Sequence, residues 1–267
     1  RSHTVLISGR ERPIPRARSA WEIPSSASRD FSRIGRFPMF QTFASDELKN
    51  LYVEKMYAGQ WAGTMCLTEP QAGSAVGDVK TSAVKEGDVY KITGTKIFIS
   101  SGDHDLTENI IHPVLARTPD APPGIKGISL FIVPKVRVNP DGTLGESNDV
   151  RCGNIEEKMG IHGSSTCTLN FGDEGNCIGY LVGEENKGIV YMFHMMNEAR
   201  INVGLQGSAL GAAAYKHALQ YAKERMQGVD VRSMKDPNAP RVPISDHPDV
   251  RRMLLFGKSV TEATRAL

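Results

Sequence analysis

The spacing of hydrophobic residues changes at Gly188, and this change constrains the fold more than any other feature of the sequence. Between about Trp61 and Gly183, short runs rich in Val, Ile, Thr and Phe alternate with Gly, Pro and Asp turn signals. Such runs indicate a compact antiparallel β-barrel or sandwich. From Gly188 to Gln227 the apolar residues recur at helical spacing, which predicts one long helix. The turn signals stand at 86–88, 119–124 and 139–142.

Helices are also expected on both sides of these regions. Ser45, followed by two acidic residues, is typical of a helix start, and an apolar stripe continues to about Gly59. Beyond Gln227, a loop rich in Pro leads to Asp246, which we expect to cap a second helix beginning HPDVRRMLL. Three glycines near one face of the long helix predict a second helix packed closely there. They are Gly204, Gly207 and Gly211.

The first 40 residues differ in composition from the rest. They contain eight arginines, no lysine and three acidic residues, with neither helical nor strand periodicity. A disordered leader or unrelated joined sequence fits this pattern better than an organelle transit peptide, because prolines in RERPIPRAR would break the amphipathic helix of such a peptide. The chain begins with Arg and ends within a helical pattern, so we expect it to be incomplete at both ends.

Charge, hydropathy and cysteine content exclude several classes of protein. A formal net charge of +2 gives no field that would favour nucleic acid or an anionic membrane. The longest apolar runs, such as Ile128–Pro134, are far shorter than the roughly 20 residues of a membrane-spanning helix. The four cysteines form no CxxC pair and no zinc-like cluster, so buried, reduced thiols are expected, as in a cytoplasm or an organelle matrix.

Two segments of the β-region point to a ligand. Met65–Ser74, MCLTEPQAGS, is expected to be a strand end and a turn followed by small residues, which let backbone amides approach a flat ligand. The segment TGTKIFISSGD, residues 93–103, is a second strand that ends in hydroxyl and glycine residues after the aromatic Phe98. Taken alone, either segment could equally be an ordinary strand closed by a turn.

Together these segments resemble the two flavin-binding segments of the acyl-CoA dehydrogenases. Four further segments match that family in the same order, so the resemblance covers about Ser45 to Leu267. Within the family it is nearest to the bacterial subgroup that includes methylthiopropionyl-CoA dehydrogenases. There are two departures: Ala75 replaces an acidic residue of the first signature, and Phe98 replaces the usual tryptophan. The further segments are GISLFIVP, EEKMGIHGSSTCTLNF, LVGEENKG and the stretch 196–228.

The resemblance implies an α+β fold with FAD as cofactor. Residues 1–44 would be a leader foreign to the family, 45–60 the last helix of an otherwise absent N-terminal helical domain, 61–184 the middle β-domain, and 185–267 the start of a C-terminal helical bundle. Flavin-binding positions carried over from the family are Met65, Leu67, Thr68, Gly73, Ser74, Phe98, Ile99, Ser100 and Arg225. Substrate-binding positions are Ser74, Asn197 and Arg200.

The roles of these residues follow from the family. The strand amides and the Thr68 hydroxyl would bind the polar edge of the flavin, while Phe98 and Ser100 would cover its other side. Arg225 would bind the FAD pyrophosphate of a neighbouring subunit, for which a planar guanidinium is suited. His162, which lies in a turn near the expected path of CoA, is interpreted as a turn residue and not as an acid or base.

The implied reaction is the α,β-dehydrogenation of an acyl-CoA to the trans-2-enoyl-CoA, which requires a carboxylate base. Most family members carry this glutamate at a point beyond residue 267 here, and a minority carry it at the position of Ala199. Glu198 is adjacent, but one residue turns a helical side chain by about 100°. No catalytic base is therefore expected within this chain.

The resemblance also implies partners and leaves alternatives. Acyl-CoA is the expected substrate, an electron-transfer flavoprotein the expected electron acceptor, and a homodimer or homotetramer the expected assembly. We expect a bacterial cytoplasmic location, with a mitochondrial matrix as the alternative, and no membrane or nucleic-acid partner. The competing functions are a non-catalytic or DNA-binding paralogue on the same fold, and an acyl-CoA oxidase.

Overall fold

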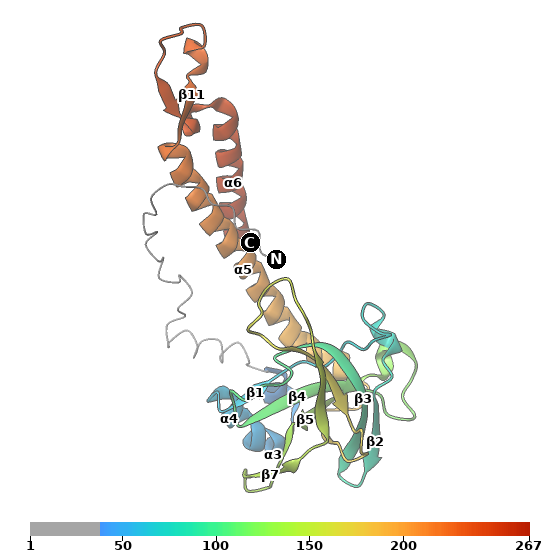
Figure 1. Cartoon of the computed structure of the whole chain (residues 1–267). Helices are drawn as coiled ribbons and strands as arrows, with labels where there is room; N and C mark the ends of the chain where they lie inside the picture. Colours follow the sequence, from blue (N-terminus) through green and yellow to red (C-terminus); the bar gives the residue numbers. More distant parts are fainter. Residues whose placement is uncertain (1–37) are drawn as a thin grey trace, which may run out of the picture. The chain divides into compact units, whose positions relative to one another are not determined.

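The computed structural model describes residues 38–267, which divide after Ile189 into two units (Figure 1). The segment 1–37, which holds most of the predicted leader, lies outside the described residues. The first unit contains short helices and a sheet, whereas the second consists mainly of two helices. No helix among residues 38–267 has both the length and the hydropathy needed to cross a bilayer.

The first unit opens with four short helical elements. Ser45 is the N-cap that was predicted, and its hydroxyl accepts a hydrogen bond from Leu48 N at 3.3 Å. From there the helix continues to Tyr57, as expected, although its middle turns are π-helical. One helix, α2, was not predicted and begins inside the segment expected to lack periodicity. The elements are α2 (Pro38–Phe43), α3 (Asp46–Leu48), η1 (Lys49–Val53) and α4 (Glu54–Tyr57).

An eight-stranded sheet follows, with the order β1-β4-β5-β10-β3-β9-β8 and with β2 paired to β3. Every pair in it is antiparallel except β1 with β4, which is parallel. Strands β6 and β7 form a separate antiparallel pair. The strands are β1 (Trp61–Gly63), β2 (Ser82–Glu86), β3 (Val89–Ser100), β4 (Asn109–Ala116), β5 (Ser129–Pro134), β6 (Val136–Val138), β7 (Leu144–Ser147), β8 (Val150–Ile155), β9 (Thr166–Phe171) and β10 (Ile178–Leu181).

The core of this unit lies between strands that are far apart in sequence. Strands β4 and β5 are buried at every position, so they appear in the sequence as mainly apolar runs, although Asn109, His112 and Ser129 are polar. Strand β9, which lies between β3 and β8, instead alternates between buried and half-buried residues. Three of the four cysteines are buried and the fourth, Cys152, is half-buried, all as free thiols, as the sequence predicts. The predicted sheet-based middle region is therefore confirmed.

The second unit is dominated by the long helix α5 (Gly188–Glu224), which ends close to the predicted point. A hairpin of β11 (Met226–Val229) and β12 (Arg241–Pro243) leads to α6 (Pro248–Ala266). The helices pack together through small residues: an added Cβ at Gly211 would lie 3.9 Å from Thr261, and one at Gly257 would lie 3.5 Å from Tyr215. At Gly211 the second helix is therefore at ordinary van der Waals distance, which leaves room for a side chain, so the predicted need for close packing is not confirmed there.

Two details of the second unit differ from expectation. Gly204 and Gly207 face open space in the described chain, so no close packing explains them. Asp246 is not the N-cap of α6: it belongs to the short turn η5 (Ile244–Asp246), and the N-cap is His247, whose side chain makes no capping bond. Pro248 at the first helical position sets the helix start instead, because its fixed φ suits that position.

Candidate functional site

The segment Met65–Ser74 lies along strand β4 and then turns sharply. Cys66 N donates to Pro113 O at 2.9 Å, and Leu115 N donates to Cys66 O at 3.1 Å. Cys66 points into the core, whereas Met65 and Leu67 on either side of it are half-buried. The pattern is that of a strand with one face available to a ligand.

The turn that follows is closed by its own backbone. Glu69 N donates to Ala72 O and Ala72 N donates to Glu69 O, both at 3.0 Å, with Pro70 between them. Gly73 and Ser74 leave the turn exposed, and an added Cβ at Gly73 would lie 3.8 Å from the Thr68 side chain. The predicted close-approach turn is therefore present in the structure.

The second segment contains a β-bulge. The register of β3 against β9 shifts between Lys96 and Ile99. Within the bulge, Phe98 has a φ of +60° and is 60% exposed. A bulky residue rarely adopts this left-handed conformation, and bulges commonly redirect a side chain. The structure thus directs an aromatic ring outward from a strand whose neighbouring residues, Lys96 and Ile99, are buried.

The bulge and the turn are joined by hydrogen bonds. Ile97 N, which lies in the bulge, donates to Thr68 O at 2.9 Å. Lys96 Nζ donates to Leu67 O at 3.0 Å and to Glu69 Oε1 at 2.8 Å. The two sequence segments predicted to line a flavin are therefore neighbours, and their contact is made by backbone groups and by one buried ion pair.

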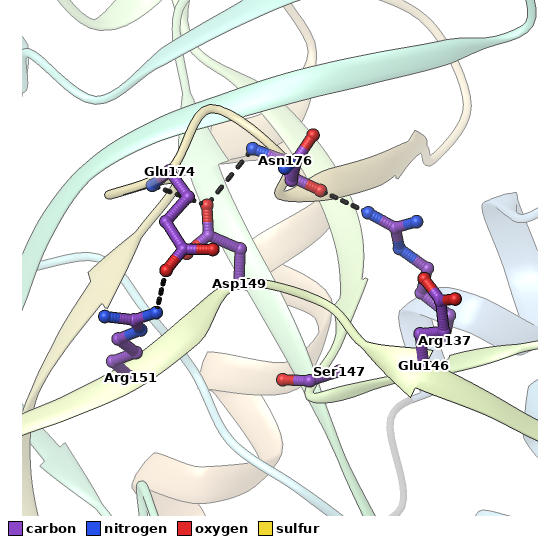
Figure 2. Close-up of a pocket in the computed structure, with 7 residues that line it drawn as sticks. All are labelled: Arg137, Glu146, Ser147, Asp149, Arg151, Glu174 and Asn176. Atoms are coloured by element: carbon purple, nitrogen blue, oxygen red, sulfur yellow. Dashed lines mark hydrogen bonds and ion pairs between the residues drawn. The ribbon is translucent and has the colours of Figure 1, made fainter.

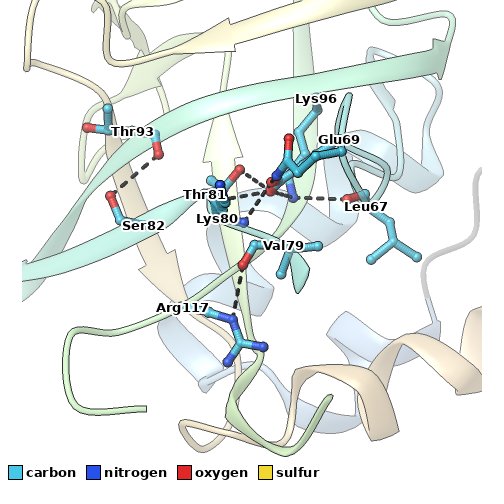
Figure 3. Close-up of polar contacts among 10 residues, drawn as sticks. Leu67, Glu69, Val79, Lys80, Thr81, Ser82, Thr93, Lys96 and Arg117 are labelled. Atoms are coloured by element: carbon cyan, nitrogen blue, oxygen red, sulfur yellow. Dashed lines mark hydrogen bonds and ion pairs between the residues drawn. The ribbon is translucent and has the colours of Figure 1, made fainter. Parts of the chain in front are cut away.

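The Glu69 carboxylate accepts five hydrogen bonds, and Figure 3 shows it at the centre of this cluster. Both side chains of the ion pair are buried, with Glu69 3% and Lys96 0% exposed. A side chain at Gly94 would come within 2.5 Å of Thr81 Oγ1, so glycine there permits the approach of Thr81. The donors to Glu69 are Lys96 Nζ, Thr81 N (3.0 Å), Thr81 Oγ1 (2.5 Å), Lys80 N (2.7 Å) and Gln71 Nε2 (2.6 Å).

These donors keep Glu69 ionised. Burial raises the pKa of this carboxyl, but the Lys96 ammonium and the hydrogen bonds from Lys80, Lys96 and Thr81 outweigh it and lower the pKa to about 2. The carboxylate therefore contributes stability above its ordinary pKa, and this contribution is lost as the pH falls toward about 2. A carboxylate held in this way cannot act as a base at neutral pH, which leaves Glu69 a structural role.

Arg117 holds the loop that follows the turn, a role that was not predicted from the sequence. Its guanidinium donates to the carbonyls of Val79 (3.0 Å) and Gly77 (2.5 Å), as well as to Pro122 and Gly124 in the loop before β5. Figure 3 shows its bond to Val79. Ala75, where the acidic residue of the signature is missing, makes no side-chain cap for the short helix η2 (Val76–Asp78). The guanidinium thus fixes this loop through its backbone.

The structure locates the remaining predicted residues of the first unit. Thr68 is half-buried, and Ser100 is exposed at the end of β3. The side chain of Ile99 is 2% exposed and belongs to the core cluster, so its backbone is the part that a ligand could reach. His162 is exposed in the turn between β8 and β9, in agreement with its interpretation as a turn residue.

The predicted residues of the second unit are exposed and have only local partners. Arg200 donates to Asn197 Oδ1 at 3.3 Å, and its guanidinium lies 5.1 Å from the centre of the Phe193 ring. Arg225 follows the last residue of α5 and donates to Gln227 Oε1 at 3.4 Å. Ala199 is half-buried and the adjacent Glu198 is exposed. The side chains of Asn197, Arg200 and Arg225 are therefore accessible within this unit.

A polar pocket of about 350 Å³ lies elsewhere in the first unit, and none of the predicted residues lines it (Figure 2). Asp149 Oδ2 accepts hydrogen bonds from Glu174 N at 2.9 Å and from Asn176 N at 3.1 Å, while Arg151 pairs with the Glu174 carboxylate. The Arg151–Glu174 pair and the two bonds to Asp149 Oδ2 are internal to this region, while Asp149 Oδ1 is buried without a hydrogen-bond partner among the described residues. We assign the pocket no function. Its lining residues are Arg137, Glu146, Ser147, Asp149, Arg151, Glu174 and Asn176.

Comparison with known proteins agrees with this geometry. Residues 64–173 match the family model described as acyl-CoA dehydrogenase, middle domain. A butyryl-CoA dehydrogenase of Syntrophomonas wolfei is 52% identical over 240 residues, which are 87% of this chain and 39% of that protein. This chain belongs to the acyl-CoA dehydrogenase family. The matched residues include both segments joined at the Glu69–Lys96 ion pair.

Two further relatives support the assignment. A 3-methylmercaptopropionyl-CoA dehydrogenase of Ruegeria pomeroyi is 45% identical over 272 residues, covering 100% of this chain and 45% of that protein. The crystal structure of butyryl-CoA dehydrogenase from Megasphaera elsdenii superposes with a TM-score of 0.66 at 25% identity, covering 87% of this chain and 54% of that one. This chain thus spans less than half the length of the Syntrophomonas and Ruegeria relatives. The Ruegeria protein agrees with the subgroup suggested by the sequence.

Proposed function

We propose that this chain supplies the flavin- and substrate-binding β-domain of an enzyme that dehydrogenates an acyl-CoA to the trans-2-enoyl-CoA. The observation that carries the proposal is the junction of the two segments, where Ile97 N bonds Thr68 O and the adjacent Phe98 ring is 60% exposed. The relatives named above support the class of reaction. The proposal concerns the full-length protein, of which this chain is the part described.

The residues at this junction fit FAD. The outward Phe98 ring offers an apolar face for a planar ring system, and the half-buried Met65 and Leu67 offer a second apolar surface. The Thr68 and Ser100 hydroxyls can hydrogen-bond the polar edge of that ring system. When bound, FAD would accept a hydride from the β-carbon of the substrate.

The remaining roles are assigned to the helical unit. We propose that Arg225 binds a pyrophosphate of FAD held by a neighbouring subunit, because an exposed guanidinium can donate two parallel hydrogen bonds to it. Asn197 and Arg200, together with Ser74 of the first unit, are proposed to contact the acyl-CoA. Arg225 thereby links the proposal to a homodimer or homotetramer.

No residue of this chain is assigned as the catalytic base. Alanine at position 199 has no proton-accepting group, and Glu198 projects about 100° away around the helix. Glu69 is excluded because five donors hold it as a buried carboxylate. We further propose that the full-length protein is cytoplasmic and passes electrons to an electron-transfer flavoprotein.

The test is spectroscopic. The full-length protein should be yellow as purified, and its flavin absorption should bleach when an acyl-CoA is added without oxygen. Oxygen uptake during turnover would instead identify an acyl-CoA oxidase. A protein that binds no flavin and responds to no acyl-CoA would contradict the proposal and favour a non-catalytic or DNA-binding paralogue.

A further inference from the structure

Lys96 is placed where the two proposed flavin-facing segments meet. It is the last residue of β3 to pair in register before the bulge that directs Phe98 outward. Its ammonium group bonds both Leu67 O and Glu69 Oε1, and its side chain is fully buried. One side chain therefore connects the strand end and the turn of the first segment to the bulge of the second.

We propose that Lys96 is a positioning residue of the flavin site, with Glu69 as its anchor. This inference rests on the proposed function. Lys96 holds the Leu67 carbonyl, and with it the Thr68 backbone, at a fixed distance from β3. The Thr68 hydroxyl and the Phe98 ring thereby keep the relative placement that a bound flavin would require.

Stability alone does not explain a buried ion pair at this point. Replacing such a pair with well-packed neutral residues is often neutral or stabilising, because removal of two charges from water costs as much as their attraction returns. The pair does provide directed hydrogen bonds to a backbone carbonyl, to two backbone amides and to the Thr81 hydroxyl. Apolar packing would not fix the positions of these groups in the same way.

The effect is expected to be geometric. Lys96 and Glu69 carry opposite charges 2.8 Å apart, so together they add little net charge to the site. Without them the first segment keeps the backbone bonds between Glu69 and Ala72 and the bond from Ile97 N to Thr68 O, but it loses the side-chain link to β3 through Lys96. A misplacement of about 1 Å at a positioning group can cost about a hundredfold in function.

The experiment uses the full-length protein and a double substitution, Glu69→Gln with Lys96→Met. Both charges are removed together, so no unpaired buried charge remains. The matched control is Glu86→Gln with Lys91→Met, which removes a more exposed pair, at 3.8 Å, that also has its lysine on β3. The measurements are the thermal unfolding midpoint, the Kd for FAD and the reduction potential of the bound flavin.

The double variant should still unfold cooperatively, at a lower temperature than the unsubstituted protein because a glutamine at position 69 accepts fewer hydrogen bonds than the carboxylate. It should bind FAD about tenfold or more weakly and show a shifted flavin potential. The control should match the unsubstituted protein in all three measurements. A folded double variant with unchanged Kd and potential would overturn the inference while leaving the proposed function intact. An unsubstituted protein that binds no FAD would overturn the proposed function, and the inference with it.

If the double variant does not fold, the same measurements on the Thr81→Val variant test the inference. This change removes one donor to Glu69 Oε1 but leaves the ion pair and the Thr81 backbone bond in place. FAD binding that is weakened by about twofold to fivefold, together with a shifted potential, supports the inference, since only one of the five bonds to the Glu69 carboxylate is lost. Unchanged binding and potential in the folded variant would overturn it.

Discussion

The residues proposed to bind FAD and acyl-CoA lie in two regions that are organised very differently. In the β-domain, the residues around Glu69 and Lys96 are buried and bonded to one another by backbone and side-chain groups. On the helical unit, Asn197, Arg200 and Arg225 are exposed and have only neighbours in sequence as partners. In the β-domain, hydrogen bonds within the chain fix the positions of the side chains. Under the proposed function, contacts with the ligand and with a neighbouring subunit would fix the positions of the side chains on the helical unit.

This difference predicts which substitutions affect folding and which affect binding. A change in the buried cluster leaves a polar group without a partner in a region that water cannot reach, so it lowers stability. A change on the exposed helix costs little stability, because water replaces the lost partner. Substitutions in the two regions therefore separate stability from ligand affinity.

The largest expected effect follows from breaking the ion pair on one side. Lys96→Met alone should lower the free energy of unfolding by about 3–5 kcal/mol, because it leaves the buried Glu69 carboxylate without its counter-ion. Lys91→Met, on the same strand but in an exposed pair, should change it by about 0.5 kcal/mol or less. Urea unfolding measures both values. Equal costs at the two positions would show that burial of the pair does not matter.

A second effect concerns pH. Burial lowers the pKa of His112 to about 3, and the side chain is fully buried with Nδ1 2.8 Å from Thr64 Oγ1. His112 therefore takes up a proton near pH 6.5 in the unfolded chain but only near pH 3 in the folded chain. The free energy of unfolding falls as the pH drops from about 6.5 toward 3, by up to about 1.4 kcal/mol per pH unit. Unfolding free energies measured between pH 7 and 4 should show this slope.

Two variants test the origin of the slope. His112→Gln should reduce it, because the titrating group is gone, whereas His162→Gln, at an exposed position, should retain it. Equal slopes in the two variants would assign the pH dependence to other groups.

A smaller effect is expected at the edge of the buried cluster. Thr81→Val removes one hydrogen bond to an ionised carboxylate and should lower the free energy of unfolding by about 1.5–3 kcal/mol. Thr95→Val is a suitable comparison, because the half-buried Thr95 hydroxyl bonds the neutral Asn170 side chain at 2.9 Å and should cost about 0.5–1.5 kcal/mol. Thermal or urea unfolding gives both values. A greater loss at Thr95 would contradict the central role of Glu69.

The smallest effect on stability belongs to the helical unit. Arg225→Ala should change the free energy of unfolding by about 0.5 kcal/mol or less, since the side chain is exposed. The same variant of the full-length protein should bind FAD at least tenfold more weakly if the guanidinium contacts its pyrophosphate. Arg232→Ala, at an exposed arginine paired with Asp230, serves as the control for lost charge. Similar FAD affinities in the two variants would contradict the role proposed for Arg225.

The sequence predicted the elements more readily than their contacts. Hydrophobic spacing predicted the strand-rich region and the long helix, and Ser45 with the two acidic residues after it predicted the cap, because each of these features depends on local residues. The bulge at Phe98 was not predicted, since its left-handed backbone is imposed by pairing with β9 and by the bond from Ile97 to Thr68. Likewise, Asp246 was a plausible cap, but Pro248 determines where α6 begins.

One signal in the sequence pointed to the ion pair and was missed. Lys96 falls on the same alternating phase of β3 as the buried residues Tyr90 and Ile92. A charged side chain on the inward phase of a strand requires a buried partner. The partner, Glu69, lies 27 residues earlier, beyond an intervening strand, so periodicity alone could not identify it.

The most direct test of the two-segment site is amide hydrogen exchange of the full-length protein with and without FAD. Slower exchange is predicted at 65–74 and at 97–101 when FAD is present, with no change in the pocket around Asp149 and Glu174. Protection confined to that pocket, or no FAD-dependent protection in either segment of a protein that binds FAD, would contradict the assignment of the flavin to the junction at Lys96.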